Sequence, residues 1–345
     1  MNTFDTILFG NGLTLSILNE IEYSCKTELN EDERLLCNQN EYIAHLLSCP
    51  VDCYPYDGLL RICTYDTPSK HEINRIISAH KNAKEEFTQI DDLSGQTHID
   101  YIRKNGFEAW GGLHCFDNES SFYKRNKELV YAINNYWFHL LRKNVLSKAC
   151  SKAIIRNNAD IVSGFENKLT LNFDNIIDGL CAVEHLHGSF VSDFMRWGDV
   201  FFLDFGDNSF EYPYLFGTNA YEKDCRIKRI NKTKREDKYY DLDFFFNDTR
   251  YYGDLLIYGI SFADSRLSVP SFFPKGETIN SEVYHNCLDG HILKRLNWLQ
   301  SSGRVNHITI ASYQEKDVSH YQRLINDFDL DSEIVAGASI EYYTR

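Results

Sequence analysis

The sequence predicts an α/β fold in which an open parallel sheet carries a large helical insertion. Three short, β-prone apolar runs support this prediction, at residues 5–9, 168–172 and 254–259. The last run is apolar almost throughout, which is typical of a central strand buried on both faces of a parallel sheet. Each run ends in or next to Gly or Asn. Residues just past the carboxyl ends of such strands face the ligand crevice of the sheet.

The N-terminal segment predicts a strand, a glycine turn and a helix. The strand at 5–9 stops at Gly10, and residues 13–22 then place apolar side chains at helical spacing. This order of elements is the opening of a nucleotide-binding α/β unit.

Residues 23–165 predict a mainly helical module. Three segments repeat apolar residues at helix-like spacing, namely 32–48, 71–87 and 128–151. A connection of this length between two strands of one sheet is far longer than ordinary connections. We therefore predict that residues 1–22 and 166–345 form the α/β domain and that 23–165 is an inserted helical module.

The C-terminal half continues the alternation of strands and helices. We expect a helix-like run at 175–180, a strand at 182–186, a helix at 291–300, a strand at 306–311, a helix at 317–328 and an edge strand at 339–343. Residues 223–238 are rich in Lys and Arg and poor in apolar residues, so we expect a surface loop there. A cap over an anionic ligand, or a docking patch, is the alternative for this loop.

The composition excludes several classes of protein. The net charge of -14 over 345 residues argues against a general binder of nucleic acid or of anionic membranes. An anionic small molecule held by backbone amides remains compatible with this charge, because such a site is local. We find no signal peptide and no apolar run long enough to span a bilayer, so we expect a cytoplasmic protein.

The ten cysteines are expected to be reduced thiols, because no export signal accompanies them. Cys49, Cys53 and Cys63 raise the alternative of a structural zinc site. No second close pair of Cys or His completes the usual four ligands. We therefore predict no bound metal and expect the cysteines to be small buried apolar residues.

The first candidate site is the turn Gly10-Asn11-Gly12-Leu13-Thr14. Glycines let backbone N–H groups approach a phosphate at the N-terminus of a helix, and Thr14 can cap that helix or bond a phosphate oxygen. The G-x-G-x-x-G pattern is incomplete, so a plain tight turn is the alternative. The chain has no G-x-x-x-x-G-K-[ST] motif, which disfavours ATP hydrolysis by that route.

The second candidate site follows the strand at 168–172. Asn172 and Asp174 end this strand, although a turn residue and a helix N-cap would explain them equally well. His187 precedes Gly188, and an imidazole has a suitable pKa for a general base at neutral pH. A structural histidine is the alternative for His187, and His185 is the competing candidate on the same strand face.

The third candidate site follows the strand at 254–259. Gly259, Ser261 and Asp264 are compatible with close approach of the backbone to a ribose or a phosphate. A strand-to-loop exit capped by a short polar side chain is the alternative interpretation.

The order of these motifs is more specific than any one of them. The chain reads G-N-G-L-T, then L-T-L-N-F-D, then L-H-G-S, then I-Y-G-I-S-F-A-D. In this order it resembles the sirtuin-like family, in the divergent bacterial branch found in anti-phage defence systems. That branch typically reads T-x-N-Y-D, H-G and G-[YF]-S-x-x-D, and the abortive-infection H family shares the layout. The resemblance covers the strand ends of the α/β core.

The resemblance implies a Rossmann-like fold that binds NAD in an extended groove. It implies two catalytic residues, Asn172 to position the nicotinamide ribose and the attacking water, and His187 as the general base. It implies NAD contacts at the strand ends, from Gly10, Asn11, Gly12, Thr14, Asp174, Gly259, Ser261 and Asp264.

The implied activity is that of an NAD⁺ glycohydrolase that releases nicotinamide and ADP-ribose and causes abortive infection, without a metal. Such an activity needs restraint, so we expect a partner defence protein or a homo-oligomer. A non-catalytic sensor or scaffold subunit that binds NAD or another nucleotide is the alternative. Protein deacylation is disfavoured, because the paired C-x-x-C zinc ribbon and the G-I-P-D-F-R segment are both missing.

Overall fold

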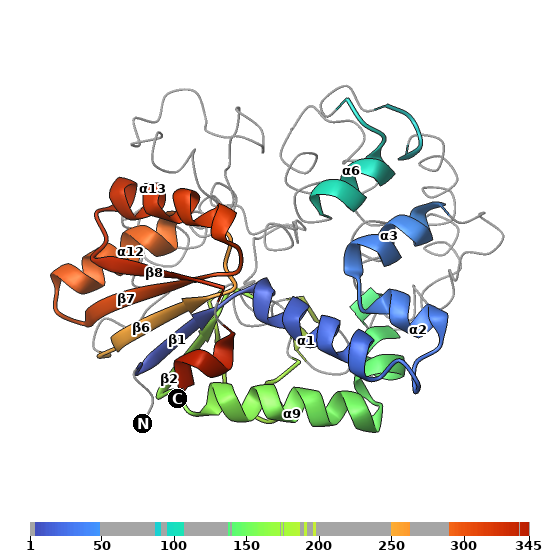
Figure 1. Cartoon of the computed structure of the whole chain (residues 1–345), viewed down its shortest axis with the longest axis horizontal. Helices are drawn as coiled ribbons and strands as arrows, with labels where there is room; N and C mark the ends of the chain where they lie inside the picture. The colour runs from blue at the N-terminus through green and yellow to red at the C-terminus, as the bar shows by residue number, and fades with distance from the viewer. Residues whose placement is uncertain are drawn as a thin grey trace, which may run out of the picture.

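The computed structural model confirms the α/β fold. It describes residues 4–48, 87–90, 95–106, 137–138, 140–172, 174, 176–186, 190–191, 196–197, 250–262, 290–337 and 339–344. A six-stranded parallel sheet has helices on both of its faces (Figure 1). This is the Rossmann-like arrangement that the resemblance implies.

The strand order of the sheet is β3-β2-β1-β6-β7-β8. From β1 the chain adds β2 and then β3 on one side of the sheet. It then crosses to the other side of β1, where it adds β6, β7 and β8 in turn. The junction of β1 and β6 is therefore the topological switch point, where open α/β sheets place their ligands. The strands are β1 (Thr6–Phe9), β2 (Asn167–Thr170), β3 (Glu184–His185), β6 (Gly253–Tyr258), β7 (Val305–Ser312) and β8 (Ser332–Ala336). A separate antiparallel pair joins β4 (Phe190–Val191) to β5 (Arg196–Trp197).

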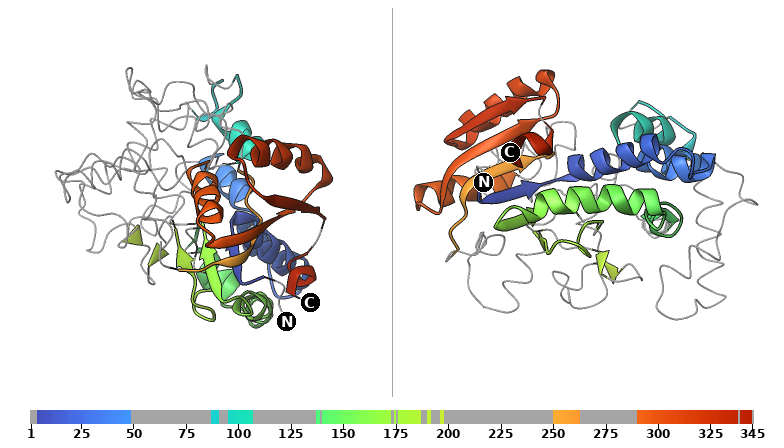
Figure 2. Two further views of the ribbon diagram at one scale, coloured as in Figure 1. Left: turned by 90° about the vertical axis from the view of Figure 1, so that its left-hand side faces the viewer. Right: turned by 60° about the horizontal axis from the view of Figure 1, so that its bottom comes forward.

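Successive side chains of β1 enter two different cores, because the side chains of a strand alternate between its faces. Ile7 and Phe9 pack with α1 (Asn11–Ser24) and α9 (Ala149–Ser163). Leu8 packs on the other face with α12 (Gly290–Ser301) and α13 (Val318–Phe328). Figure 2 shows these two helical layers on either side of the sheet.

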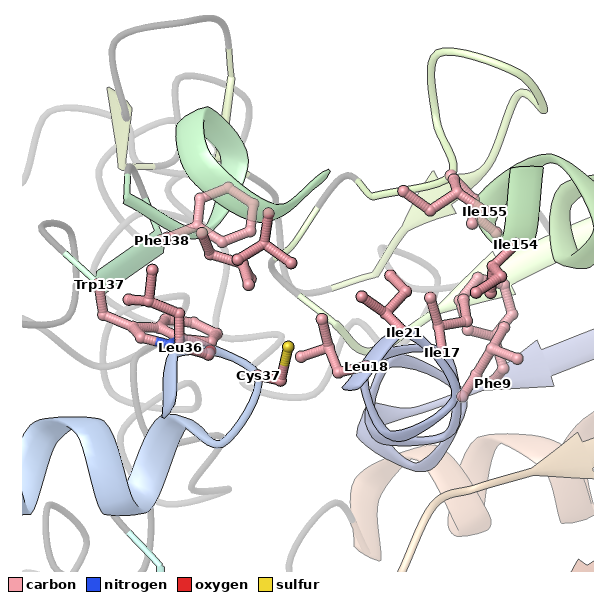
Figure 3. Close-up of a cluster of buried hydrophobic side chains, with 14 of the residues drawn as sticks. Phe9, Ile17, Leu18, Ile21, Leu36, Cys37, Trp137, Phe138, Ile154 and Ile155 are labelled. Atoms are coloured by element: carbon pink, nitrogen blue, oxygen red, sulfur yellow. The ribbon is translucent and has the colours of Figure 1, made fainter. Parts of the chain in front are cut away.

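The core on the α1 face continues into the segment predicted as a helical insertion. In Figure 3 the side chains of Phe9, Ile17 and Ile154 lie at one end of this core, and those of Leu36 and Trp137 lie at the other. Nε1 of Trp137 donates a hydrogen bond to the carbonyl oxygen of Leu36 at 2.9 Å. The other helices in the described part of this segment are α2 (Glu31–Leu36), α3 (Gln39–Ser48), α6 (His98–Asn105) and the π-helix η2 (Leu141–Leu146). The proposed division at residues 22 and 165 stays a prediction.

Two predicted helices are interrupted. The helix expected at 32–48 is split into α2 and α3, because the side chain of Asn38 accepts a hydrogen bond from the backbone N–H of Glu41 and so starts a new helix. Residues 128–136 and 139 of the helix expected at 128–151 lie outside the described residues, and its described part breaks at Ser147, with α9 beginning two residues later. Residues 71–86 and 223–238 lie outside the described residues.

Two other predictions are wrong. The run at 176–180 forms successive turns and not a helix. In the segment expected as an edge strand at 339–343, residues 340–343 belong to the 3₁₀-helix η7 (Ile340–Thr344), and the edge strand in the C-terminal part of the chain is β8. Ile340 and Tyr343 are both buried in the α1-face core. Their spacing of three residues fits the period of a 3₁₀-helix, so the helical conformation of this segment buries both side chains on one face.

The expectation that all cysteines are reduced is wrong for one pair, because Cys25 and Cys150 form a disulfide. This bond joins the end of α1 to the first turn of α9, across 125 residues of sequence. The pairing follows from the packing of α1 on α9, which the sequence alone does not specify. Cys37 and Cys181 are buried free thiols, and Cys49, Cys53 and Cys63 lie outside the described residues.

Candidate functional site

The turns after β1 and β6 pack directly on each other at the switch point. The backbone N–H of Gly12 donates to the carbonyl oxygen of Gly259 at 2.8 Å, and that of Gly10 donates to the carbonyl oxygen of Tyr258 at 3.0 Å. Gly259 has a φ of +66°, a conformation that favours glycine. The two turns therefore form one continuous backbone surface at the carboxyl edge of the sheet.

This packing leaves no space for side chains at the glycines. A Cβ atom on Gly12 would lie 2.5 Å from the Cα of Gly259, and one on Gly10 would lie 2.6 Å from a side-chain carbon of Ile260. Contact between the turns is thus sufficient to explain both glycines of the predicted phosphate loop. It also uses the backbone N–H of Gly12 within the protein, so this group is not directed at a ligand.

A chain of side-chain hydrogen bonds joins the end of β2 to the first turn of α1. Nδ2 of Asn172 donates to Oγ1 of Thr14 at 2.9 Å, and the Thr14 hydroxyl donates to Oδ2 of Asp174 at 2.7 Å. Asn172 and Thr14 are both buried. Residues predicted from two separate strand ends therefore meet in one cluster, which we call the Asn172–Thr14–Asp174 cluster.

Local turn chemistry holds Asn172 and Asp174 in place. The hydroxyl of Thr170 donates to the carbonyl oxygen of Phe9 and accepts from the backbone N–H of Asn172, each at 3.0 Å. Oδ1 of Asp174 accepts from the backbone N–H of Ile176 at 3.2 Å. Asp174 therefore forms an Asx-turn with Ile176, and the helix N-cap weighed from the sequence is wrong, because residues 176–180 form turns and not a helix.

Burial raises the pKa of the Asp174 carboxyl above its ordinary value. The hydrogen bonds from Thr14 and from the backbone of Ile176 oppose this rise but do not cancel it. The folded protein therefore favours the neutral form of Asp174 more than the unfolded chain does.

His185 has both ring nitrogens bonded inside the protein. Nδ1 lies 2.7 Å from the carbonyl oxygen of Asn172, and Nε2 lies 2.7 Å from Oδ2 of Asp178. Burial alone would lower the pKa of His185, but the hydrogen bond and the charge of Asp178 outweigh it and the pKa is raised. The ring therefore offers no lone pair to a substrate water. His187, the first choice as general base, lies outside the described residues.

The exit of β6 is held by α13. Nε2 of His320 donates to the carbonyl oxygens of Ser261 and Phe262 at 3.0 and 2.9 Å, and the Tyr321 hydroxyl donates to the carbonyl oxygen of Ile260 at 2.9 Å. Phe262 has a φ of +43°. No local sequence pattern points to His320 and Tyr321, because their contacts cross about 60 residues.

The structure brings most predicted site residues to one edge of the sheet, at the carboxyl ends of β1, β2 and β6 (Figure 1). The side chains of Asn11 and Ser261 are exposed there. Asp264 lies outside the described residues. The predicted site residues placed at this edge are Gly10, Asn11, Gly12, Thr14, Asn172, Asp174, Gly259 and Ser261.

The part of the chain that the structure describes contains no group of three His, Cys, Asp or Glu residues arranged to hold a metal ion. None of its helices is long and apolar enough to cross a membrane. No protein family model, curated protein or solved structure matches the chain.

Proposed function

We propose that this chain binds NAD⁺ at the carboxyl edge of β1, β2 and β6 and hydrolyses the bond between nicotinamide and ribose. The observation that carries this proposal is the Asn172–Thr14–Asp174 cluster, which lies beside the switch point of the sheet. Ligands of open α/β sheets bind at this point. The motif order that resembles the sirtuin-like family supports NAD⁺ as the ligand.

The reaction requires two contributions from the protein, which are positioning of the reactants and a general base. The glycosidic bond breaks through a cation-like transition state, and nicotinamide leaves as a neutral molecule. Water then adds to the anomeric carbon and loses a proton, which gives ADP-ribose. Asn172 would position the ribose and the water, and such positioning can contribute about 7–11 kcal/mol. His187 would accept the proton, and a general base contributes roughly 10²–10⁴-fold.

The start of α1 suits the pyrophosphate of NAD⁺. The helix is 14 residues long and begins at the carboxyl edge of β1, with no acidic residue in its first turn. The positive end of its dipole therefore favours an anion at this position. The net charge of the whole chain, -14, does not oppose such a local site.

An uncontrolled NAD⁺ hydrolase would damage its own cell. We propose that the activity causes abortive infection in an anti-phage defence system and that a partner protein or self-association restrains it. The resemblance to the defence branch of the sirtuin-like family supports this role, and the helices between α1 and β2 offer a surface for regulation.

A sensor or scaffold subunit that binds NAD or another nucleotide without turnover is the second candidate. The observation in its favour is His185. This histidine contacts Asn172 directly, and both of its ring nitrogens bond within the protein. The described part of the site therefore provides binding groups and no free imidazole.

Measuring the consumption of NAD⁺ together with the release of nicotinamide and ADP-ribose tests the proposal. We would compare the wild type with Asn172→Ala and His187→Ala. Asn306→Ala is the matched control, because Asn306 is exposed at the opposite edge of the sheet, near the start of β7. Each protein would be assayed over a range of concentrations, so that self-association is sampled.

Loss of turnover in Asn172→Ala and His187→Ala, with the control unchanged, supports hydrolysis and both roles. Binding of NAD⁺ without consumption under every condition favours the sensor. Hydrolysis that survives both substitutions would mean that the reaction occurs elsewhere on the chain.

A further inference from the structure

We infer that His185, held by Asp178 with both ring nitrogens protonated, is a positioning residue that fixes the backbone of Asn172 for NAD⁺ cleavage. This inference rests on the proposed function. It assigns a role to a histidine that the sequence offered only as a rival general base.

The geometry determines the protons on the ring. Nδ1 faces the carbonyl oxygen of Asn172 at 2.7 Å, and a carbonyl oxygen can only accept, so Nδ1 carries a hydrogen. Nε2 faces a carboxylate oxygen of Asp178 at the same distance. The imidazolium satisfies both contacts at once, and the bond to Asp178 is then charge-assisted. The side chain of His185 is only 8% exposed, so water does not compete effectively for these contacts.

His185 completes the set of bonds that hold Asn172. The backbone N–H of Asn172 is fixed by Thr170, its side-chain amide by Thr14 and its carbonyl oxygen by His185. His185 pairs with Thr170 in the register of β2 and β3, so the ring projects from the neighbouring strand. Asp178 belongs to the turns that connect these two strands, and it prevents the ring from rotating away.

The charges around His185 favour the cation. Asp178 and Asp174 act on it from the segment after β2, and both raise its pKa. Glu184, the neighbour on β3, pairs with Arg250 at 2.8 Å. A neutral imidazole has one N–H, so loss of the proton removes either the bond to Asp178 or the bond to Asn172. Activity is therefore expected to fall as the pH rises through the pKa of His185.

Imidazole NMR tests the proton state without relying on activity. In ¹H–¹⁵N spectra of histidine-labelled protein, assigned with His185→Gln, both nitrogens of His185 should carry hydrogens at pH 7. They should keep both hydrogens to a higher pH than a free histidine imidazole, whose pKa is about 6.5. Asp178→Asn should move this transition to lower pH. A wild-type His185 with one protonated nitrogen at pH 7 overturns the inference.

Kinetics test the positioning role. His185→Gln should lower kcat by about 10- to 100-fold, the scale of a misplaced catalytic group, with a much smaller change in KM. His307→Gln should leave both constants unchanged. Asp178→Asn should retain activity at low pH and lose it at a lower pH than the wild type. A merely structural role would lower thermal stability without moving the pH profile.

The outcomes separate the inference from the proposed function. Wild-type turnover together with unchanged kcat in His185→Gln overturns the positioning role and leaves NAD⁺ hydrolysis standing. Coincident pH profiles of the wild type and Asp178→Asn overturn it as well. A wild type that never consumes NAD⁺ removes the proposed function and the positioning role together, whereas the NMR result still reports the state of the ring.

Discussion

Gly12 and Gly259 touch through their backbones at the switch point of the sheet, where the N–H of Gly12 donates to the carbonyl oxygen of Gly259 at 2.8 Å. This contact couples the first strand–helix unit of the fold to the strand that begins its second half. It also determines how much the site tolerates substitution at these two positions.

Replacement of Gly259 by Ala should strongly destabilise the protein. Its Cβ would lie 2.8 Å from the Cα of Gly12, in a backbone conformation with φ of +66°. Overpacking of this kind costs about 1–3 kcal/mol, and a left-handed conformation adds roughly 1 kcal/mol or more. Urea unfolding measures the change in the free energy of unfolding.

Gly303→Ala is the matched control for this prediction, because Gly303 has a similar φ of +70° with nothing within 4 Å of the added Cβ. The difference between the two variants isolates the contact between the turns. Equal destabilisation would show that the backbone conformation alone matters and that the turns can separate without cost.

Thr14→Val should break the Asn172–Thr14–Asp174 cluster while keeping the shape of the side chain. The change removes the acceptor for Asn172 and the donor to Asp174. Leaving buried polar groups unsatisfied costs about 1–3 kcal/mol each. We expect lower stability and weaker NAD⁺ binding by calorimetry, with both restored in Thr14→Ser. Full NAD⁺ affinity in Thr14→Val would remove this cluster from the ligand site.

The pH dependence of stability should contain a contribution from His185. Its pKa is raised in the folded state. The contribution is therefore fully present below the unfolded pKa of about 6.5 and is lost as the pH rises through the folded pKa. Midpoints of urea unfolding, measured from pH 6 upward, should fall with pH in the wild type and fall less in His185→Gln.

A slope that is unchanged in His185→Gln would show that His185 has the same pKa in the folded and unfolded states. Comparison of the variants is needed because burial also raises the pKa of the Cys37 thiol, to about 12, which adds its own dependence at alkaline pH.

Reduction of the bond between Cys25 and Cys150 should destabilise the packing of α1 on α9. Disulfides that close long loops contribute about 2–4 kcal/mol, mainly by restricting the unfolded chain. The melting temperature should fall on addition of a reductant and should be insensitive to reductant in a Cys25→Ala/Cys150→Ala double variant. Ten titratable thiols in the unreduced, denatured protein would contradict the bond.

The sequence determined the elements whose patterns are local. The apolar run before Gly10 and the helical spacing after it gave β1 and α1, and the rule for parallel strand ends placed Asn172 and Thr14 at the same edge. These features follow from side-chain periodicity and from chain direction, and both can be recognised within a short segment of sequence.

Local sequence patterns do not specify which distant groups meet. The bond of His185 to the carbonyl oxygen of Asn172, the disulfide of Cys25 with Cys150 and the burial of Tyr343 in a 3₁₀-helix depend on the packing of whole elements. The same holds for Gly12, whose N–H bonds to Gly259 across the switch point and not to a phosphate. Sequence periodicity specifies which face of an element is buried, but the partner on that face is set by the three-dimensional arrangement of the sheet and its helices.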